Sequence, residues 1–349
     1  MKGPGAVEEM TVMLTEARLY EKLEENRVLC HLCSHRCRIG EGKFGVCNVR
    51  ENRGGTLYTH VYGSLIAQNV DPIEKKPLYH FLPGSTSYSI ATVGCNFKCD
   101  FCQNWQISQV AEAGRLGVQA REVKPEDVVR QAKAAGSRSI SYTYTEPTIY
   151  FEFAYDCSKI ARKEGLYNVF VTNGYMTEEM LRTIHPLLDA ANVDLKSFRD
   201  DYYKRLCKAR LQPVLDSIRT MKKTGIWIEV TTLVVPGQND DEAELKDIAS
   251  YLASVDVSIP WHISRFHPQY RMDHVESTPM KILNRAYDIG REAGLRYVYL
   301  GNVPGKQNHT YCYKCRTLLI ERGGFSVTAY RASGGQCPKC GTLQDGVGL

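Results

Sequence analysis

The chain has 349 residues and a formal net charge of +5, from 44 basic and 39 acidic residues. This length is enough for one large domain with small appendages. Lys and Arg do not form a block, so the composition gives no reason to expect a nucleic-acid partner. No apolar run approaches the length of a membrane span or a secretory signal, and we therefore expect a cytoplasmic protein without a membrane partner.

Thirteen cysteines are present, and eleven of them fall in three clusters. In a reducing cytosol this arrangement indicates metal ligation rather than disulfides. The first cluster has the spacing C-x2-C-x3-C-x9-C, which suits either zinc or a [4Fe–4S] cluster. The spacing does not distinguish the two; we favour zinc, with an auxiliary iron–sulfur cluster as the alternative, and expect the nearby His31 and His35 at the surface. The predicted ligands are Cys30, Cys33, Cys37 and Cys47.

Between the outer clusters, apolar strand-like runs alternate with helical patterns, two of which span 124–136 and 277–294. In the second, Thr278 is a candidate cap and Pro279 suits the first turn. The alternation predicts parallel βα units. A doubly wound open sheet also fits, but the segment length fits an α/β partial (β/α)6-type TIM barrel best. The strand-like runs are 87–93, 139–144, 167–173, 191–197, 226–236, 261–268 and 297–301.

Three regions are expected along the chain. Residues 1–60 form a four-cysteine metal module with a linker to about residue 85, residues 86–304 form the barrel, and residues 305–349 form a zinc-ribbon-like module. In a barrel of this kind the chemistry gathers at the carboxyl ends of the strands. The polar residues that follow the expected strands are Cys95, Glu146, Asn173, Lys196 and His267.

The segment GCNFKCDFCQNW, residues 94–105, follows the first expected barrel strand and carries Cys95, Cys99 and Cys102. Iron–sulfur clusters are normally held by four cysteines. With three, one iron of a [4Fe–4S] cluster keeps an open position for a small chelating molecule, as a catalytic zinc ion does. Zinc bound by these three thiols and a remote fourth ligand is the alternative.

This loop, with Phe101 just before its last cysteine, resembles the signature of the radical S-adenosylmethionine (SAM) superfamily. The barrel region is similar to pyruvate formate-lyase activating enzymes, and the flanking CHLCSHRC, GVCNVR and YCYKC…CPKCG elements resemble the radical SAM enzyme of the AmmeMemoRadiSam system. The resemblance implies that SAM binds the open iron and is cleaved by one electron to methionine and a 5′-deoxyadenosyl radical. That radical abstracts hydrogen from a substrate held over the barrel mouth.

The resemblance also assigns residues to SAM. The stretch YTYTEPTIYF takes the place of the superfamily's Gly-Gly-Glu-Pro, with Tyr144 and Thr145 where the family has glycines. Glu146 is then expected to contact the amino group of SAM, with a helix N-terminal acid as the alternative. The other assigned residues are Thr172 and Asn173 for ribose or carboxylate, Asp194 and Lys196 as a clamp or an internal ion pair, His267 for ribose, and Asn104 for the cluster loop or adenine.

The last cluster has the C-x2-C-x21-C-x2-C spacing of a zinc ribbon, in which two knuckles close a tetrahedral site. We expect zinc here, with rubredoxin-like iron or an auxiliary iron–sulfur cluster as alternatives. The mixed charge between the knuckles favours docking on the barrel or on a protein partner over nucleic-acid binding. The predicted ligands are Cys312, Cys315, Cys337 and Cys340.

The leading functional hypothesis is a radical SAM enzyme whose substrate is a small molecule, a peptide or a partner protein. Similarity to activating enzymes implies a glycyl residue on a partner protein as the site of hydrogen abstraction. Similarity to the AmmeMemoRadiSam enzyme implies MEMO-like and AMMECR1-like partners, and either reaction requires a reductant such as flavodoxin or ferredoxin. The alternative from a different functional class is a non-catalytic scaffold protein whose two ends are stabilised by bound metal.

Overall fold

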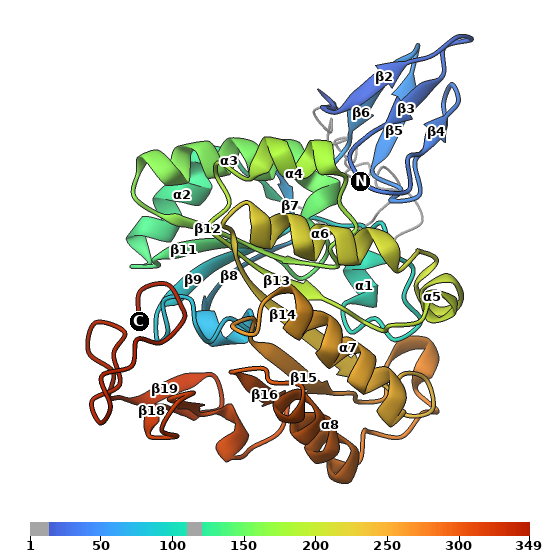
Figure 1. Cartoon of the computed structure of the whole chain (residues 1–349). Coiled ribbons are helices and arrows are strands. Elements are labelled where there is room, and N and C mark those ends of the chain that lie inside the picture. Colours follow the sequence, from blue (N-terminus) through green and yellow to red (C-terminus); the bar gives the residue numbers. More distant parts are fainter. Residues whose placement is uncertain (1–13, 110–120) are drawn as a thin grey trace, which may run out of the picture.

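The computed structural model describes residues 14–109 and 121–349, and its centre is one curved eight-stranded sheet (Figure 1). The strand order is β16-β15-β14-β13-β12-β11-β9-β8, and every pair is parallel except β8 with β9. The two outer strands, β8 and β16, are not paired with each other, so the barrel stays open on one side. The strands are β8 Ala67–Pro72, β9 Thr86–Ala91, β11 Ser139–Tyr142, β12 Tyr167–Thr172, β13 Ala190–Asp194, β14 Trp227–Val234, β15 Trp261–Arg265 and β16 Val298–Gly301.

The longer helices lie on the outer face of this sheet (Figure 1). They are amphipathic; in α8, for example, Leu283, Ala286 and Ile289 are buried. The alternation of strand-like runs and helical patterns in the sequence therefore predicted the parallel α/β architecture correctly. The α-helices are α1 Trp105–Ser108, α2 Pro125–Ala134, α3 Phe151–Lys163, α4 Glu178–Ile184, α5 Asp200–Tyr202, α6 Gln212–Lys223, α7 Glu242–Val255 and α8 Met280–Glu292; the shorter helical turns are η1 Ile73–Lys75, η3 Pro147–Tyr150, η4 Tyr203–Cys207, η5 Tyr270–Met272 and η6 Lys306–Asn308.

Thr278 does not cap α8, contrary to the prediction from sequence. The helix begins after Pro279 with no side-chain cap. The Thr278 hydroxyl instead accepts a hydrogen bond from the Phe266 backbone N–H at 2.8 Å and donates to the Val234 carbonyl at 2.6 Å. It thereby ties the ends of β14 and β15 together, because a buried hydroxyl in this position finds backbone partners outside the helix.

Two small sheets precede the barrel and pack on it. They have the orders β1-β6-β5 and β2-β3-β4. Arg50, on β5, forms a buried ion pair with Glu152 on α3, with its Nη2 2.5 Å from both carboxylate oxygens. This pair joins the small sheets to the barrel. The strands are β1 Thr15–Glu16, β2 Tyr20–Lys22, β3 Val28–Cys30, β4 Arg38–Ile39, β5 Arg50–Arg53 and β6 Thr56–Thr59, and a separate ribbon pairs β7 Ser64–Leu65 with β10 Arg121–Glu122.

A third small sheet, β17-β18-β19, follows the barrel and lies well apart from the N-terminal sheets (Figure 1). It is joined to the barrel by polar contacts to the segment after η1. The His80 ring bonds the Asp345 carbonyl at 2.7 Å and the Tyr299 hydroxyl at 2.6 Å, and Arg322 donates to the Tyr79 carbonyl at 2.8 Å. The strands are β17 Thr310–Tyr311, β18 Leu318–Gly323 and β19 Ser326–Tyr330.

Candidate functional site

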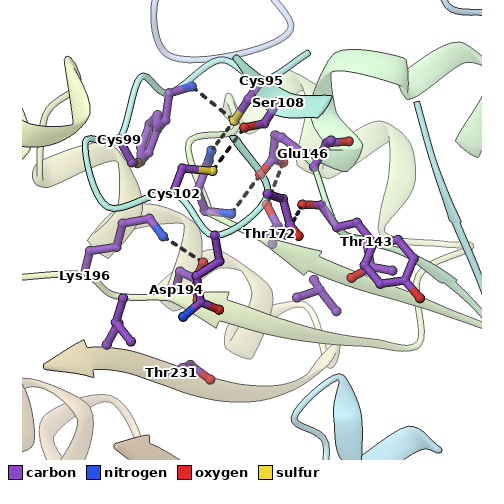
Figure 2. Close-up of a pocket in the computed structure, with 18 of the residues that line it drawn as sticks. Cys95, Cys99, Cys102, Ser108, Thr143, Glu146, Thr172, Asp194, Lys196 and Thr231 are labelled. Atoms are coloured by element: carbon purple, nitrogen blue, oxygen red, sulfur yellow. Dashed lines mark hydrogen bonds and ion pairs between the residues drawn. The ribbon is translucent and has the colours of Figure 1, made fainter. Parts of the chain in front are cut away.

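The three-cysteine loop leaves β9 at Gly94 and carries Cys95, Cys99 and Cys102 (Figure 2). Gly94 has φ +96°, and a Cβ on it would lie 2.6 Å from a methyl group of Val49 and 3.1 Å from the Cys47 carbonyl. Only glycine avoids both the left-handed strain and this contact. The turn into the loop is therefore fixed by its fit against the N-terminal sheets.

All three cysteines line one cavity of about 530 Å³ at the carboxyl ends of the barrel strands. The Cys95 sulfur accepts a hydrogen bond from the Phe97 N–H at 3.4 Å, and the Cys102 sulfur is 3.1 Å from the Ser108 hydroxyl. Burial raises the pKa of the Cys95 thiol. Three cysteines of one loop that line the same cavity fit the open cluster predicted from the loop. The other predicted site residues that line it are Asn104, Glu146, Thr172, Asn173, Asp194 and Lys196.

Glu146 is a buried carboxylate held entirely by neutral donors. It accepts hydrogen bonds from the hydroxyls of Thr148 (2.6 Å) and Thr172 (2.7 Å) and from the Asn173 N–H (2.8 Å). It also caps η3 through the Thr148 N–H at 3.1 Å. Within the described residues no Lys, Arg or His forms a salt bridge with it, and burial raises its pKa. A buried anion that lines a cavity without a cation partner fits a positively charged ligand group.

Asn173 connects the end of β12 to the cysteine loop. Its side-chain NH2 donates to the Asn96 side-chain oxygen at 2.7 Å and lies 3.9 Å from the Cys95 sulfur. Its side-chain oxygen accepts from the Tyr175 N–H at 3.0 Å. These contacts hold the Asn173 side-chain amide beside the cysteine loop. Asn173 therefore positions the loop as well as lining the cavity.

Asp194 and Lys196 form an ion pair at the end of β13, with 2.8 Å between the ammonium and a carboxylate oxygen (Figure 2). The Lys196 side chain is 13% exposed, and its ammonium lies 5.7 Å from the centre of the Phe101 ring. Burial alone would lower the pKa of Lys196, but the neighbouring Asp194 carboxylate reverses this and raises it. Lys196 is therefore a fixed positive charge at the edge of the cysteine loop.

His267 is not brought together with the other predicted residues. Its side chain is exposed, it does not line the cavity, and its Nδ1 lies 3.3 Å from the Ser277 hydroxyl. Asn104 does line the cavity and donates to the Tyr144 carbonyl at 2.7 Å. It therefore connects the cysteine loop to the stretch that contains Glu146.

Tyr144, which replaces a family glycine, keeps the backbone conformation that glycine would favour, with φ +62°. Its hydroxyl donates to Asp71, and the Lys76 ammonium lies 4.8 Å from the centre of its ring. Thr145, at the second replaced position, donates its hydroxyl to the Thr92 carbonyl at 2.8 Å. The departure from Gly-Gly is thus accommodated without loss of the loop conformation.

Several cavity residues were not predicted from sequence. Ser108 contacts the Cys102 sulfur, Lys75 and Lys76 follow β8, and Phe325 lies in the turn between β18 and β19. Cys207, which lies outside the three cysteine clusters, is buried and forms a hydrogen bond that raises the pKa of Cys99. No sequence signal identifies Lys75, Lys76 or Phe325, because they lie outside the βα pattern.

The C-terminal cysteines are close enough to share one metal ion. The Cys312 and Cys340 sulfurs are 3.6 Å apart, as are those of Cys315 and Cys337, and all four lie within 4.8 Å of one another. A hydrogen bond from Thr317 lowers the pKa of Cys315 to about 6. This geometry fits the metal site predicted from the two knuckles.

The fold and the site define a partial α/β barrel with a three-cysteine loop at the ends of its strands. The model of the Radical SAM superfamily matches residues 89–249. An uncharacterized protein of Methanocaldococcus jannaschii is 46% identical over 316 residues, which cover 90% of this chain and 93% of that protein. The chain belongs to the radical SAM superfamily.

A putative glycyl-radical enzyme activating enzyme of the same organism is 25% identical over 221 residues, covering 60% of this chain and 86% of that protein. The crystal structure of a radical SAM methyltransferase from Sphaerobacter thermophilus superimposes with a TM-score of 0.51 at 17% identity, covering 87% of this chain and 81% of that one. The predicted fold class is confirmed. The AmmeMemoRadiSam assignment stays a prediction.

Within the described residues, no helix is long and apolar enough to cross a membrane.

Proposed function

We propose that this protein is a radical SAM enzyme that abstracts a hydrogen atom from a substrate bound in the barrel cavity. The observation that carries the proposal is the meeting of the three loop cysteines with the buried Glu146 carboxylate in one cavity. When bound, the cluster supplies one electron that cleaves SAM to methionine and a 5′-deoxyadenosyl radical, which takes the hydrogen atom.

In this proposal the chain's own residues bind and orient the cofactors. Cys95, Cys99 and Cys102 would hold a [4Fe–4S] cluster through three of its irons, which would leave one iron for SAM. Glu146 binds the SAM ammonium, since its carboxylate is buried and has no cation partner among residues 14–109 and 121–349. Lys196 supplies the opposite charge for the SAM carboxylate, with Asp194 holding its ammonium 2.8 Å away.

Thr172 and Asn173 complete the cofactor site from the end of β12. Asn104 fixes the loop to the Tyr144 carbonyl. For His267 the structure offers no cavity contact, so its ribose role rests on the family resemblance alone. The substrate enters between β8 and β16, where Lys75, Lys76 and Phe325 line the cavity.

Two classes of substrate fit this proposal. The activating-enzyme relative favours a glycyl residue on a partner protein, whereas the AmmeMemoRadiSam resemblance favours a modification made with MEMO-like and AMMECR1-like proteins. Flavodoxin or ferredoxin supplies the electron in either case. A doublet radical signal on an incubated partner, seen by electron paramagnetic resonance (EPR), supports the first class, and a modified small molecule or peptide supports the second.

The reaction is tested by anaerobic reconstitution with iron and sulfide, reduction, and chromatography for 5′-deoxyadenosine. The wild type is expected to form it, and Cys95→Ala is expected to lose it. Cys157→Ala is the matched control, because Cys157 is buried in α3 and does not line the cavity. Equal product from Cys95→Ala, or none from the wild type, contradicts the proposal.

A further inference from the structure

The N-terminal cysteines Cys30, Cys33, Cys37 and Cys47 all line one small cavity between the β2-β3-β4 sheet and the barrel. Apolar side chains such as Ile39 form other parts of its wall. Cys30 and Cys47 are buried and the other two are half-buried. Four thiols that surround one shielded cavity are typical of a closed metal centre.

The grouping of the four N-terminal sulfurs can be compared with that of the C-terminal sulfurs of the same chain. Four thiolates on one zinc ion at 2.3 Å lie about 3.8 Å from one another, and the C-terminal sulfurs meet that requirement with pairs at 3.6 Å. Among the described residues, no other group of three or more Cys, His, Asp or Glu has its donor atoms all within 4.8 Å. No three of the N-terminal sulfurs meet this limit, so they are less closely grouped than the C-terminal sulfurs.

The three-cysteine loop gives the second comparison. Cys95, Cys99 and Cys102 also line one cavity and also fall outside the 4.8 Å limit that the C-terminal group satisfies. In the radical SAM superfamily this loop holds a [4Fe–4S] cluster, whose irons and sulfides keep the cysteine sulfurs apart. The N-terminal group and the loop group thus both differ from the close C-terminal group.

Arg50 provides an independent observation. It lines the N-terminal cavity, and its side chain is 2% exposed. Its Nη2 pairs with Glu152, but its Nε has no hydrogen-bond partner. An unsatisfied buried N–H is costly, and a cluster sulfur in the cavity would accept from it.

We propose that Cys30, Cys33, Cys37 and Cys47 hold a [4Fe–4S] cluster rather than zinc, with the Arg50 Nε donating a hydrogen bond to one of its sulfurs. With four cysteine ligands, every iron of this cluster is coordinated, so it transfers electrons and does not bind SAM. The centre adjoins the loop cluster: the Cys47 carbonyl packs on Gly94, and the His35 ring bonds the Asn96 carbonyl at 2.7 Å.

Metal content in a loop variant tests this site apart from the proposed reaction. In Cys95→Ala/Cys99→Ala/Cys102→Ala, purified without oxygen and reconstituted, we expect about four irons, about four sulfides and about one zinc per chain. The same variant forms no 5′-deoxyadenosine, so the result is independent of SAM cleavage. Adding Cys30→Ala and Cys33→Ala is expected to remove the iron and leave the zinc. About two zinc ions without iron, or one zinc and fewer than two irons, overturns the proposal.

Arg50→Lys tests the hydrogen bond while keeping the charge that pairs with Glu152. In the triple-alanine loop background, the N-terminal cluster is then expected to have a lower reduction potential, because a hydrogen bond to its sulfurs stabilises the more negative reduced state. EPR-monitored redox titration measures the shift, with Arg53→Lys as the control, since Arg53 is exposed and does not line the cavity. An unchanged potential in Arg50→Lys contradicts the assignment of Arg50.

Discussion

The chain contains two groups of four cysteines that differ in geometry far more than in sequence. In the C-terminal group the sulfurs approach to 3.6 Å, and Cys340 is exposed. In the N-terminal group the sulfurs surround a cavity between a small sheet and the barrel, beside the buried Arg50–Glu152 pair. The same number of cysteines thus lies in two different surroundings within one chain.

Loss of a C-terminal ligand is expected to have the largest effect. Cys337 is buried beside Leu319 and Ile320 in a very small core, and structural zinc in comparable peptides contributes about 10–16 kcal/mol. Cys337→Ala should therefore lose the predicted zinc and unfold β17–β19 while the barrel stays folded. Zinc content and hydrogen exchange of residues 310–330 measure this. Retained zinc with unchanged protection would show that the C-terminal centre is not structural.

The attachment of the N-terminal sheets is expected to depend on the ion pair between Arg50 and Glu152. Glu152→Gln leaves a buried guanidinium without its counter-charge, which costs about 3–5 kcal/mol. Chemical denaturation gives the free energy of unfolding. Glu164→Gln is the matched control, because Glu164 pairs with Lys133 at the exposed end of α3, and this substitution should leave the free energy of unfolding nearly unchanged. Equal losses in the two variants would show that the buried pair does not hold the sheets.

The attachment of the C-terminal module is expected to weaken in acid. Burial lowers the pKa of His80 to about 4; the Glu229 carboxylate opposes this, whereas Arg322 and His262 reinforce it. The unfolded chain binds a proton near pH 6.5 and the folded chain near pH 4, so stability is highest above pH 6.5 and falls by about 3 kcal/mol towards pH 4.

His80→Gln tests this expectation, because glutamine keeps hydrogen-bonding capacity but does not titrate. The difference in unfolding free energy between wild type and variant, followed from pH 7 to pH 4, should shrink as the pH falls. A constant difference across this range would mean that His80 does not titrate with the predicted pKa.

The smallest expected effect concerns one hydrogen bond to a C-terminal sulfur. The Gln344 side-chain NH2 lies 3.5 Å from the Cys312 sulfur and donates to the Thr342 carbonyl at 2.8 Å. Gln344→Ala should destabilise the C-terminal module by about 1 kcal/mol and speed zinc release to a chelator. Gln336→Ala, at an exposed position, is the control. Identical release rates would assign no role to this bond.

Buried apolar strands and the cysteine loop could be predicted from sequence because their signals are local. The runs at 139–144 and 261–268, for example, contain β11 and β15. The edge strand β8 could not be predicted from sequence, because residues 67–72 mix polar residues with half-buried and exposed positions. Its pairing with β9 is decided by tertiary contacts rather than by periodicity.

Only some of the site residues could be predicted from sequence, because strand ends have a local signal and loop paths do not. Glu146, Asn173 and Lys196 follow strands, and strand ends converge in a barrel. His267 also follows a strand, but its side chain is exposed, since nothing in the sequence specifies the path of the loop after β15. His35, expected at the surface, lines the N-terminal cavity, which depends on packing against the barrel.

The surroundings of Gly94 determine which parts of this protein can fold on their own. Its Cα faces Val49 and the Cys47 carbonyl, so the turn that presents Cys95 is shaped on one side by residues that come before the barrel. A fragment that begins at residue 66, just before β8, would expose this surface to water and free the turn. The barrel and the N-terminal sheets are therefore one cooperative unit, and excising the barrel would cost the fragment its cluster as well as its stability.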